Sequence, residues 1–366
     1  MVAHPGSIQE RMNIHENRTA PTPLIKIVVF LISLWGMYLR VDFRHTHSLW
    51  HDEIYQTGPM NGSFLDLIKA LPRYEFSAYI SGDHYLTYPF YRIFSDNVWG
   101  LALPHIAATI LSFYFFYLIC KRYLTTAAGW VVAFLVFSFN ATLIEKAFEI
   151  RVYPMLVLLA LVSFYVGQML DGEEFKFDQR KQWPFILFYV LLIWFHPYAI
   201  AIAFLPLVYF FGLRLGQASL KAVLWRAVKF FAVVLPIAMP LWIISMFGPH
   251  LNVHFSPDAL FRYIPSPLVD PIGSLKGIFC NMMGNRIFYF LFLLFPCSWL
   301  LPHPDRGKQI WFFLVMVIFP VLLMLGMDLA TGYYFIQRQF IWAMPFFVLL
   351  IGWCLESLLR NKTGRA

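Results

Sequence analysis

The chain has 366 residues, of which 60% are hydrophobic, 19% aromatic and only 13% charged, with a formal net charge of +8 at pH 7. Soluble globular proteins average about 45–50% apolar and about 25% charged residues. The composition therefore excludes an ordinary soluble domain and indicates a protein that crosses a membrane several times. The four cysteines (Cys120, Cys280, Cys297 and Cys354) follow neither a disulfide pattern nor a zinc-ligand spacing.

Apolar runs separated by charged residues or by Pro and Gly predict ten membrane-spanning helices, because about 20 apolar residues cross a bilayer. The predicted spans are 24–42, 97–119, 127–143, 152–170, 183–196, 197–213, 228–247, 287–302, 310–327 and 336–358. We expect the fifth and sixth to be short or broken near His196 and Pro197. The predicted fold is an all-α membrane bundle at 24–358 between short tails at 1–23 and 359–366.

The positions of the basic residues predict the orientation of these spans. Most of the 28 Lys and Arg residues face the cytoplasm if the N-terminus is cytoplasmic, as the positive-inside rule requires. An even number of spans then places both termini in the cytoplasm, with the chain in the cell (inner) membrane. Topology thus accounts for the basic charge, and no nucleic-acid partner is expected.

Two long loops are predicted on the outer side, at 43–96 and 248–285. In the first loop, apolar and charged residues alternate over 63–79 in a manner typical of a helix that lies in the membrane interface. The second loop is rich in proline and is predicted to form a lid. These loops would carry most of the mass outside the membrane.

Acids, arginines and histidines gather at the predicted outer face. The candidates are Asp52, Glu53, Asp83, His84, Glu149, Arg151, His196 and Arg338. Each has a structural alternative: the acids are able to cap a helix, the arginines to anchor to headgroups, and His196 to end a helix with its ring satisfied. Charged groups near lipid are costly and are usually retained for function, so we favour a functional site.

The predicted position of this cluster at the outer ends of the spans distinguishes an enzyme from a transporter. A transporter or flippase of a lipid-linked saccharide, the main alternative, would place charges near mid-membrane at broken helices. Here the middles of the spans are largely aliphatic and aromatic. The pattern favours an enzyme at the outer interface.

Transfer of a sugar from a lipid phosphate would need such residues. The lipid tail stays in the bilayer, arginines bind the leaving phosphate, and a carboxylate deprotonates the acceptor hydroxyl. Adjacent acids with histidines are also able to hold a divalent cation. We favour a site without metal and expect no other cofactor.

Several segments resemble the GT-C glycosyltransferases of the protein O-mannosyltransferase-like family, which includes aminoarabinose transferases. The matching segments are Ser48-Leu49-Trp50-His51-Asp52-Glu53, Glu149-Ile150-Arg151-Val152-Tyr153, His196-Pro197-Tyr198, Arg338-Gln339-Phe340 with Pro345, and Asp83-His84 before Pro89-Phe90-Tyr91. We expect no extra C-terminal soluble domain, in which the chain would depart from the family, and it has Gln339 where an aromatic residue often follows the arginine.

The resemblance implies a GT-C bundle with interface-parallel helices in the first outer loop and a polyprenyl-phosphate-linked sugar as donor. By position, Asp52 would be the general base of an inverting transfer and Glu53 would orient it or the acceptor. The other site residues would bind substrate: Arg151 and Arg338 would hold phosphate, Tyr153 and His196 would line the site, and Asp83, His84 and Glu149 complete the set. The sugar, the linkage and the acceptor (a glycan, lipid or protein) stay open. A polysaccharide polymerase or an acyltransferase would need a different set of residues.

Overall fold

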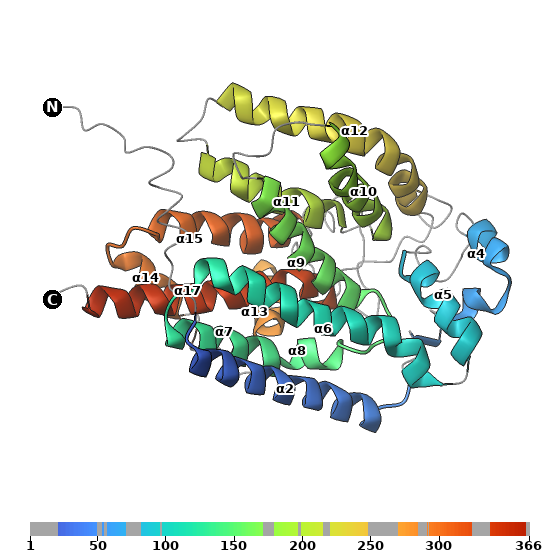
Figure 1. The fold of residues 1–366 in the computed structure, drawn as a ribbon, viewed down its shortest axis with the longest axis horizontal. Helices are drawn as coiled ribbons and strands as arrows, with labels where there is room; N and C mark the ends of the chain where they lie inside the picture. The colour runs from blue at the N-terminus through green and yellow to red at the C-terminus, as the bar shows by residue number, and fades with distance from the viewer. Residues whose placement is uncertain are drawn as a thin grey trace.

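The structure is a computed structural model that describes residues 21–49, 53–54, 57–70, 82–95, 97–170, 179–196, 199–214, 220–247, 270–284, 291, 293–323 and 337–363. Within these ranges every regular element is a helix. Figure 1 shows an elongated bundle in which the start of α2 and the end of α17 lie at one end. Helices α4 and α5 lie at the opposite end.

The described helices follow one another along the chain. They are α2 (Pro23–Thr46), η1 (Gly58–Asn61), α4 (Phe64–Ala70), α5 (Gly82–Phe94), α6 (Val98–Tyr123), α7 (Ala127–Phe139), α8 (Ala141–Glu145), α9 (Tyr153–Leu170), α10 (Gln179–Phe195), α11 (Ala199–Arg214), α12 (Leu220–Phe247), α13 (Pro271–Met283), α14 (Leu294–Leu300), α15 (Arg306–Phe313), the π-helical η4 (Leu314–Ile318), the 3-10 helix η5 (Gln337–Ala343) and α17 (Met344–Thr363).

Four helical segments of the described chain are long and apolar enough to cross a membrane. They are Pro23–Thr46, Val98–Tyr123, Arg306–Leu323 and Phe340–Arg360. Shorter apolar helices lie at Ala127–Phe139, Tyr153–Met169, Trp183–Phe195, Ala199–Leu213 and Val228–Pro240. This is the architecture of a polytopic all-α membrane protein. The ten predicted spans do not all have a long helical counterpart.

Two of the predicted spans differ in detail from the observed helices, and one predicted break is confirmed. The predicted span 127–143 is divided at Asn140, whose side chain accepts a hydrogen bond from the backbone N–H of Leu143 (3.1 Å) and starts α8. The span at 287–302 corresponds to only the seven residues of α14 in the described part. The predicted break near His196 is present, because α10 ends at Phe195 and α11 begins at Ala199.

Polar side chains fix where several helices begin. Oδ1 of Asn97 accepts hydrogen bonds from the backbone N–H groups of Trp99 (3.0 Å) and Gly100 (3.1 Å) at the start of α6. At α4, Ser63 and Asp66 exchange hydrogen bonds in a capping box. The Ser63 donors lower the pKa of Asp66. The predicted amphipathic helix at 63–79 is thus present as α4 over its first part, and residues 71–79 lie outside the described ranges.

The core of the bundle is aromatic. Phe164 of α9 lies 5.0–5.8 Å, centroid to centroid, from the rings of Tyr209, Phe210, Phe312 and Phe346, which belong to other helices. Helix α2 is peripheral, because only 17% of its 18-residue apolar stretch is buried. A peripheral apolar helix of this kind presents most of its surface to lipid.

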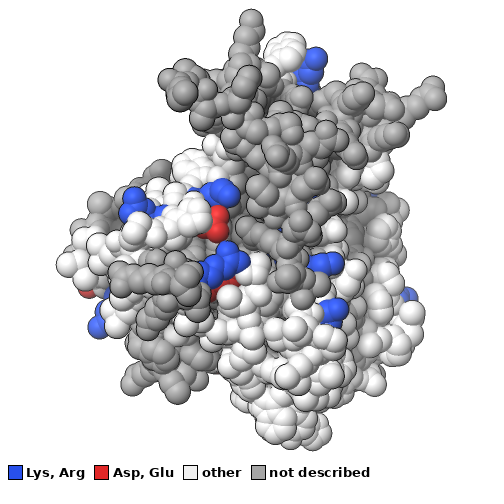
Figure 2. Space-filling model, turned by 60° about the vertical axis from the view of Figure 1, so that its left-hand side comes forward, with Lys and Arg blue, Asp and Glu red and all other residues white. Residues whose placement is uncertain are grey.

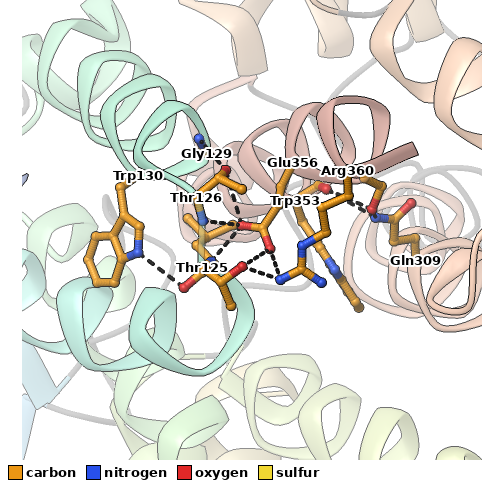
Figure 3. Close-up of polar contacts among 10 residues, drawn as sticks. Thr125, Thr126, Gly129, Trp130, Gln309, Trp353, Glu356 and Arg360 are labelled. Carbon is orange, nitrogen blue, oxygen red and sulfur yellow. Dashed lines mark hydrogen bonds and ion pairs between the residues drawn. The ribbon is translucent and has the colours of Figure 1, made fainter. Parts of the chain in front are cut away.

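At the end of the bundle that carries the end of α17, a carboxylate joins α17 to α7 (Figure 3). Glu356 is 2% exposed and accepts hydrogen bonds from the backbone N–H groups of Thr125 (2.6 Å) and Thr126 (3.1 Å). It also forms an ion pair with Arg360 (2.7 Å). A negative charge at a helix N-terminus is favourable, so Glu356 stabilises the start of α7 while it fixes α17. We call these residues the Glu356 cluster.

Helix α13 ends at a residue that must be glycine. Gly284 has a φ of +63°, and a Cβ atom there would lie 2.4 Å from the side chain of Asn140. A left-handed residue after the last turn is a common helix ending. This ending lets α13 stop against the connection between α7 and α8.

Candidate functional site

The centre of the candidate site is the buried carboxylate of Glu53, in the segment between α2 and η1. Its side chain is 0% exposed. Nη1 of Arg44, near the end of α2, donates to Oε1 (2.9 Å) and Oε2 (3.1 Å) of Glu53. The backbone N–H of Ile150 donates to Oε1 (2.7 Å). Glu53 therefore joins two segments that are 97 residues apart in the chain; we call this set of bonds the Glu53 clamp.

The segment that meets Glu53 is the turn between α8 and α9. Thr109 of α6 donates to the carbonyl oxygen of Ala147 (2.7 Å). Within the turn, Nζ of Lys146 lies 3.0 Å from Oε2 of Glu149, and the N–H of Arg151 donates to the carbonyl of Glu149 (2.7 Å). Glu149 is 3% exposed, so this predicted substrate-binding acid lies in a buried ion pair.

Three further predicted residues lie beside this turn. Cζ of Arg151 is 5.4 Å from the centroid of the Tyr153 ring, a distance typical of a cation–π interaction. His196, in the connection between α10 and α11, is 7% exposed. Burial, and in second place the charge of Arg151, lower the pKa of His196 and keep its ring neutral. The Arg151 charge, the Tyr153 ring and the His196 ring thus belong to one polar region.

The other predicted pair, Asp83 and His84, lies in the first turn of α5. Oδ1 of Asp83 is 3.0 Å from Nε2 of His105 in α6, and both side chains are 0% exposed. His84 is 2% exposed. Asp83 therefore connects α5 to α6 at the end of the bundle opposite the Glu356 cluster. Asp83, a predicted substrate-binding residue, is thus paired with His105 of the protein itself.

For two predicted residues, Asp52 and Arg338, the structure does not describe the side chain. Asp52 lies outside the described residues, but it is the chain neighbour of Glu53. Arg338 lies in η5, which packs against α9, and its side chain is outside the description.

The sequence interpretation missed the cations on the buried face of α2. Gly36, Arg40 and Arg44 recur every four residues and form one stripe on the helix. Nη1 of Arg40 donates to the carbonyl oxygens of Gly36 (2.8 Å) and Ser138 (2.9 Å), and Nη2 to that of Phe137 (3.2 Å). Two arginines at i,i+4 spacing near the end of an apolar run are the signal that could have found them.

Arg40 also borders a small cavity of about 20 Å³ below the turn. Thr109, Ser112 and Lys146 contribute to its walls, with Phe113 and Phe137. The volume suits about one water molecule. The cavity is too small for a sugar or a phosphate, so we assign it no ligand.

The described residues offer no metal site. No group of three or more His, Cys, Asp or Glu side chains able to hold a metal ion occurs in the part of the chain that the structure describes. Asp52 and His51 fall outside that part.

The described helices define the class of the protein as a polytopic α-helical membrane protein. Its buried, charged polar region lies at one end of the helix bundle. A scan against protein-family models finds no match, and a search of curated proteins also finds none. The assignment of an activity therefore depends on the residues themselves and on the resemblance of the motifs.

Proposed function

We propose that this protein is a membrane glycosyltransferase that moves a monosaccharide from a polyprenyl-phosphate donor to an acceptor hydroxyl outside the cytoplasm. The observation that carries the proposal is the hydrogen bond from the Ile150 N–H to Glu53. Glu53 is the neighbour of the proposed base Asp52, and Ile150 is the neighbour of the proposed phosphate ligand Arg151. The clamp thus ties the chain segments of the two key residues together.

The reaction would proceed by a single displacement. Asp52 takes the proton of the acceptor hydroxyl as its oxygen bonds to the anomeric carbon. The bond from that carbon to the phosphate oxygen breaks, its electron pair stays on the phosphate, and the configuration at the anomeric carbon inverts. Arg151 and Arg338 stabilise the charge that the departing polyprenyl phosphate gains.

The other residues support these roles. Glu53 positions Asp52 because its own carboxylate is fixed by Arg44 and Ile150. Lys146 holds Glu149, which shapes the turn that carries Arg151. Tyr153 and the neutral ring of His196 line the donor side. The lipid tail would lie along the apolar helices, with the active site outside and both termini in the cytoplasm.

The test is transfer from polyprenyl-phosphate sugars to membrane acceptors by the purified, reconstituted protein. Asp52→Asn should abolish transfer at wild-type expression and membrane insertion, with Asp42→Asn, an exposed acid on α2, as matched control. Arg151→Ala should raise the KM for the lipid donor at least tenfold, because it removes a charge-assisted contact to phosphate. Full activity of Asp52→Asn would refute its role as base. Movement of the intact lipid-linked sugar across the bilayer without transfer would instead identify a flippase.

A further inference from the structure

Exposed basic side chains gather at the end of the bundle that carries the start of α2 and the end of α17. They are Lys26, Lys121, Arg122, Arg306, Lys308 and Arg360. Figure 2, in which this end is turned forward, shows several separate basic patches and little acidic surface. We call this surface the basic end.

Hydrogen bonds between the helices show that these helix ends meet in space. Glu356 of α17 binds Thr125, just after α6. Gln309 of α15 donates to Ser357 of α17 (2.8 Å). The cations from α6, α15 and α17 therefore belong to one surface, although they are far apart in the sequence.

Two acids accompany these cations in the part of the chain that the structure describes. Asp305 lies 3.4 Å from Lys308, and Glu356 is buried within its own cluster. Six exposed cations thus face two carboxylates among the described residues of this end. The opposite end is mixed: it exposes Asp42, Asp66 and Glu145 together with Lys69 and Arg92.

Exposed apolar side chains lie directly beside the cations. Lys26 is flanked by Leu24 (69% exposed) and Ile27 (56%). Arg306 begins the helix that follows Leu300 (81% exposed). Cations next to exposed aliphatic groups are typical of the level at which phospholipid headgroups meet acyl chains. A nucleic-acid surface would not need these apolar neighbours.

We infer that the basic end binds anionic phospholipid headgroups of the leaflet that it meets. The phosphates accept charge-assisted hydrogen bonds from Lys and Arg, and the apolar neighbours contact the upper acyl chains. This binding is separate from the proposed transfer reaction, which uses the other end of the bundle. It would fix the protein's depth and orientation in the membrane.

The experiment is lipid retention by the full-length protein in native mass spectrometry after equilibration with equal amounts of phosphatidylglycerol and phosphatidylcholine. The test variant is Lys121→Gln/Arg306→Gln/Lys308→Gln. The control, Lys69→Gln/Arg92→Gln/Lys276→Gln, removes the same number of exposed charges elsewhere. Arg360 is left intact because it belongs to the Glu356 cluster. Melting temperature in neutral lipid checks the folding of each variant.

Each basic residue near an anionic surface contributes roughly fivefold in binding, so the test variant should lose at least about tenfold of its preference for phosphatidylglycerol. The control variant should keep it, and high salt should weaken it in the wild type because the charges are screened. Absence of a preference in the wild type would overturn the inference. Equal losses of the preference in the two variants would also overturn it. If the test variant does not fold, the salt dependence of the wild type decides, and a preference unaffected by salt would overturn the inference.

Discussion

Glu53 is the residue at which the segment between α2 and η1 meets the turn before α9. A carboxylate with no exposed surface is costly unless it is paired and hydrogen-bonded. Arg44 supplies the charge and Ile150 an additional donor. Because three segments depend on this one side chain, its loss should affect both the fold and the geometry next to Asp52.

We expect Arg44→Met to destabilise the protein by about 3–5 kcal/mol, because it removes the arginine that is paired with the buried Glu53 carboxylate. Thermal unfolding in detergent measures this loss. The double variant Arg44→Met/Glu53→Gln should be less destabilised than the sum of the two single variants. Arg92→Met, which removes an exposed arginine, is the control. An Arg44→Met protein with wild-type stability would show that the ion pair does not stabilise the fold.

His196 should make the stability of the protein depend on pH. Its pKa in the folded protein lies below the ordinary value of 6.5 because of burial and the Arg151 charge. Below about pH 6.5 the unfolded chain therefore binds a proton that the folded chain does not, and stability falls as the pH decreases. The melting temperature should drop on acidification, and His196→Gln should reduce that drop. An equal drop in the variant would exclude His196 as its cause.

At the scale of elements, the Glu356 cluster determines how α17 meets α7 (Figure 3). Its carboxylate satisfies N–H groups that no turn of α7 is able to satisfy. Glu356 lies 231 positions after Thr125 and 230 positions after Thr126 in the chain. The cluster is therefore a long-range substitute for a local cap.

Replacing Glu356 by alanine should cost about 2–4 kcal/mol, since it removes a helix cap and leaves buried donors unsatisfied. Glu145→Ala, at an exposed acid, should change stability by less than about 0.5 kcal/mol. Denaturation in mild detergent, followed by tryptophan fluorescence, compares the two. Equal stabilities of the two variants would contradict the assigned role of the cluster.

Apolar periodicity predicted the helical class and most helix positions, including the separation of α10 from α11 near His196. It could not predict the division at Asn140, because a cap inside an apolar run leaves the mean hydropathy almost unchanged. The partners of Glu53, Asp83 and Glu356 were also beyond sequence reasoning. Arg44, His105 and Thr125 acquire these roles only through packing between helices that are distant in the chain.

For the whole molecule, the structure separates two polar ends by an aromatic and aliphatic bundle. One end holds the Glu53 clamp and the pair of Asp83 with His105, and the other holds the basic end and the Glu356 cluster. This division agrees with an active site on one side of a membrane and anchoring on the other. The side that faces the cytoplasm stays a prediction from the distribution of Lys and Arg.

We propose that the Glu53 end of the bundle acts on a polyprenyl-phosphate-linked sugar. Mass spectrometry of the lipids that copurify with Asp52→Asn is the sharpest test of this proposal, because a variant without the base should bind the donor but not consume it. An intact polyprenyl-phosphate sugar should be enriched over the wild type and should be lost when Arg151→Ala is added. Copurified lipid without any such sugar, or the same sugar retained in equal amount by the Arg151→Ala protein, would contradict the proposal.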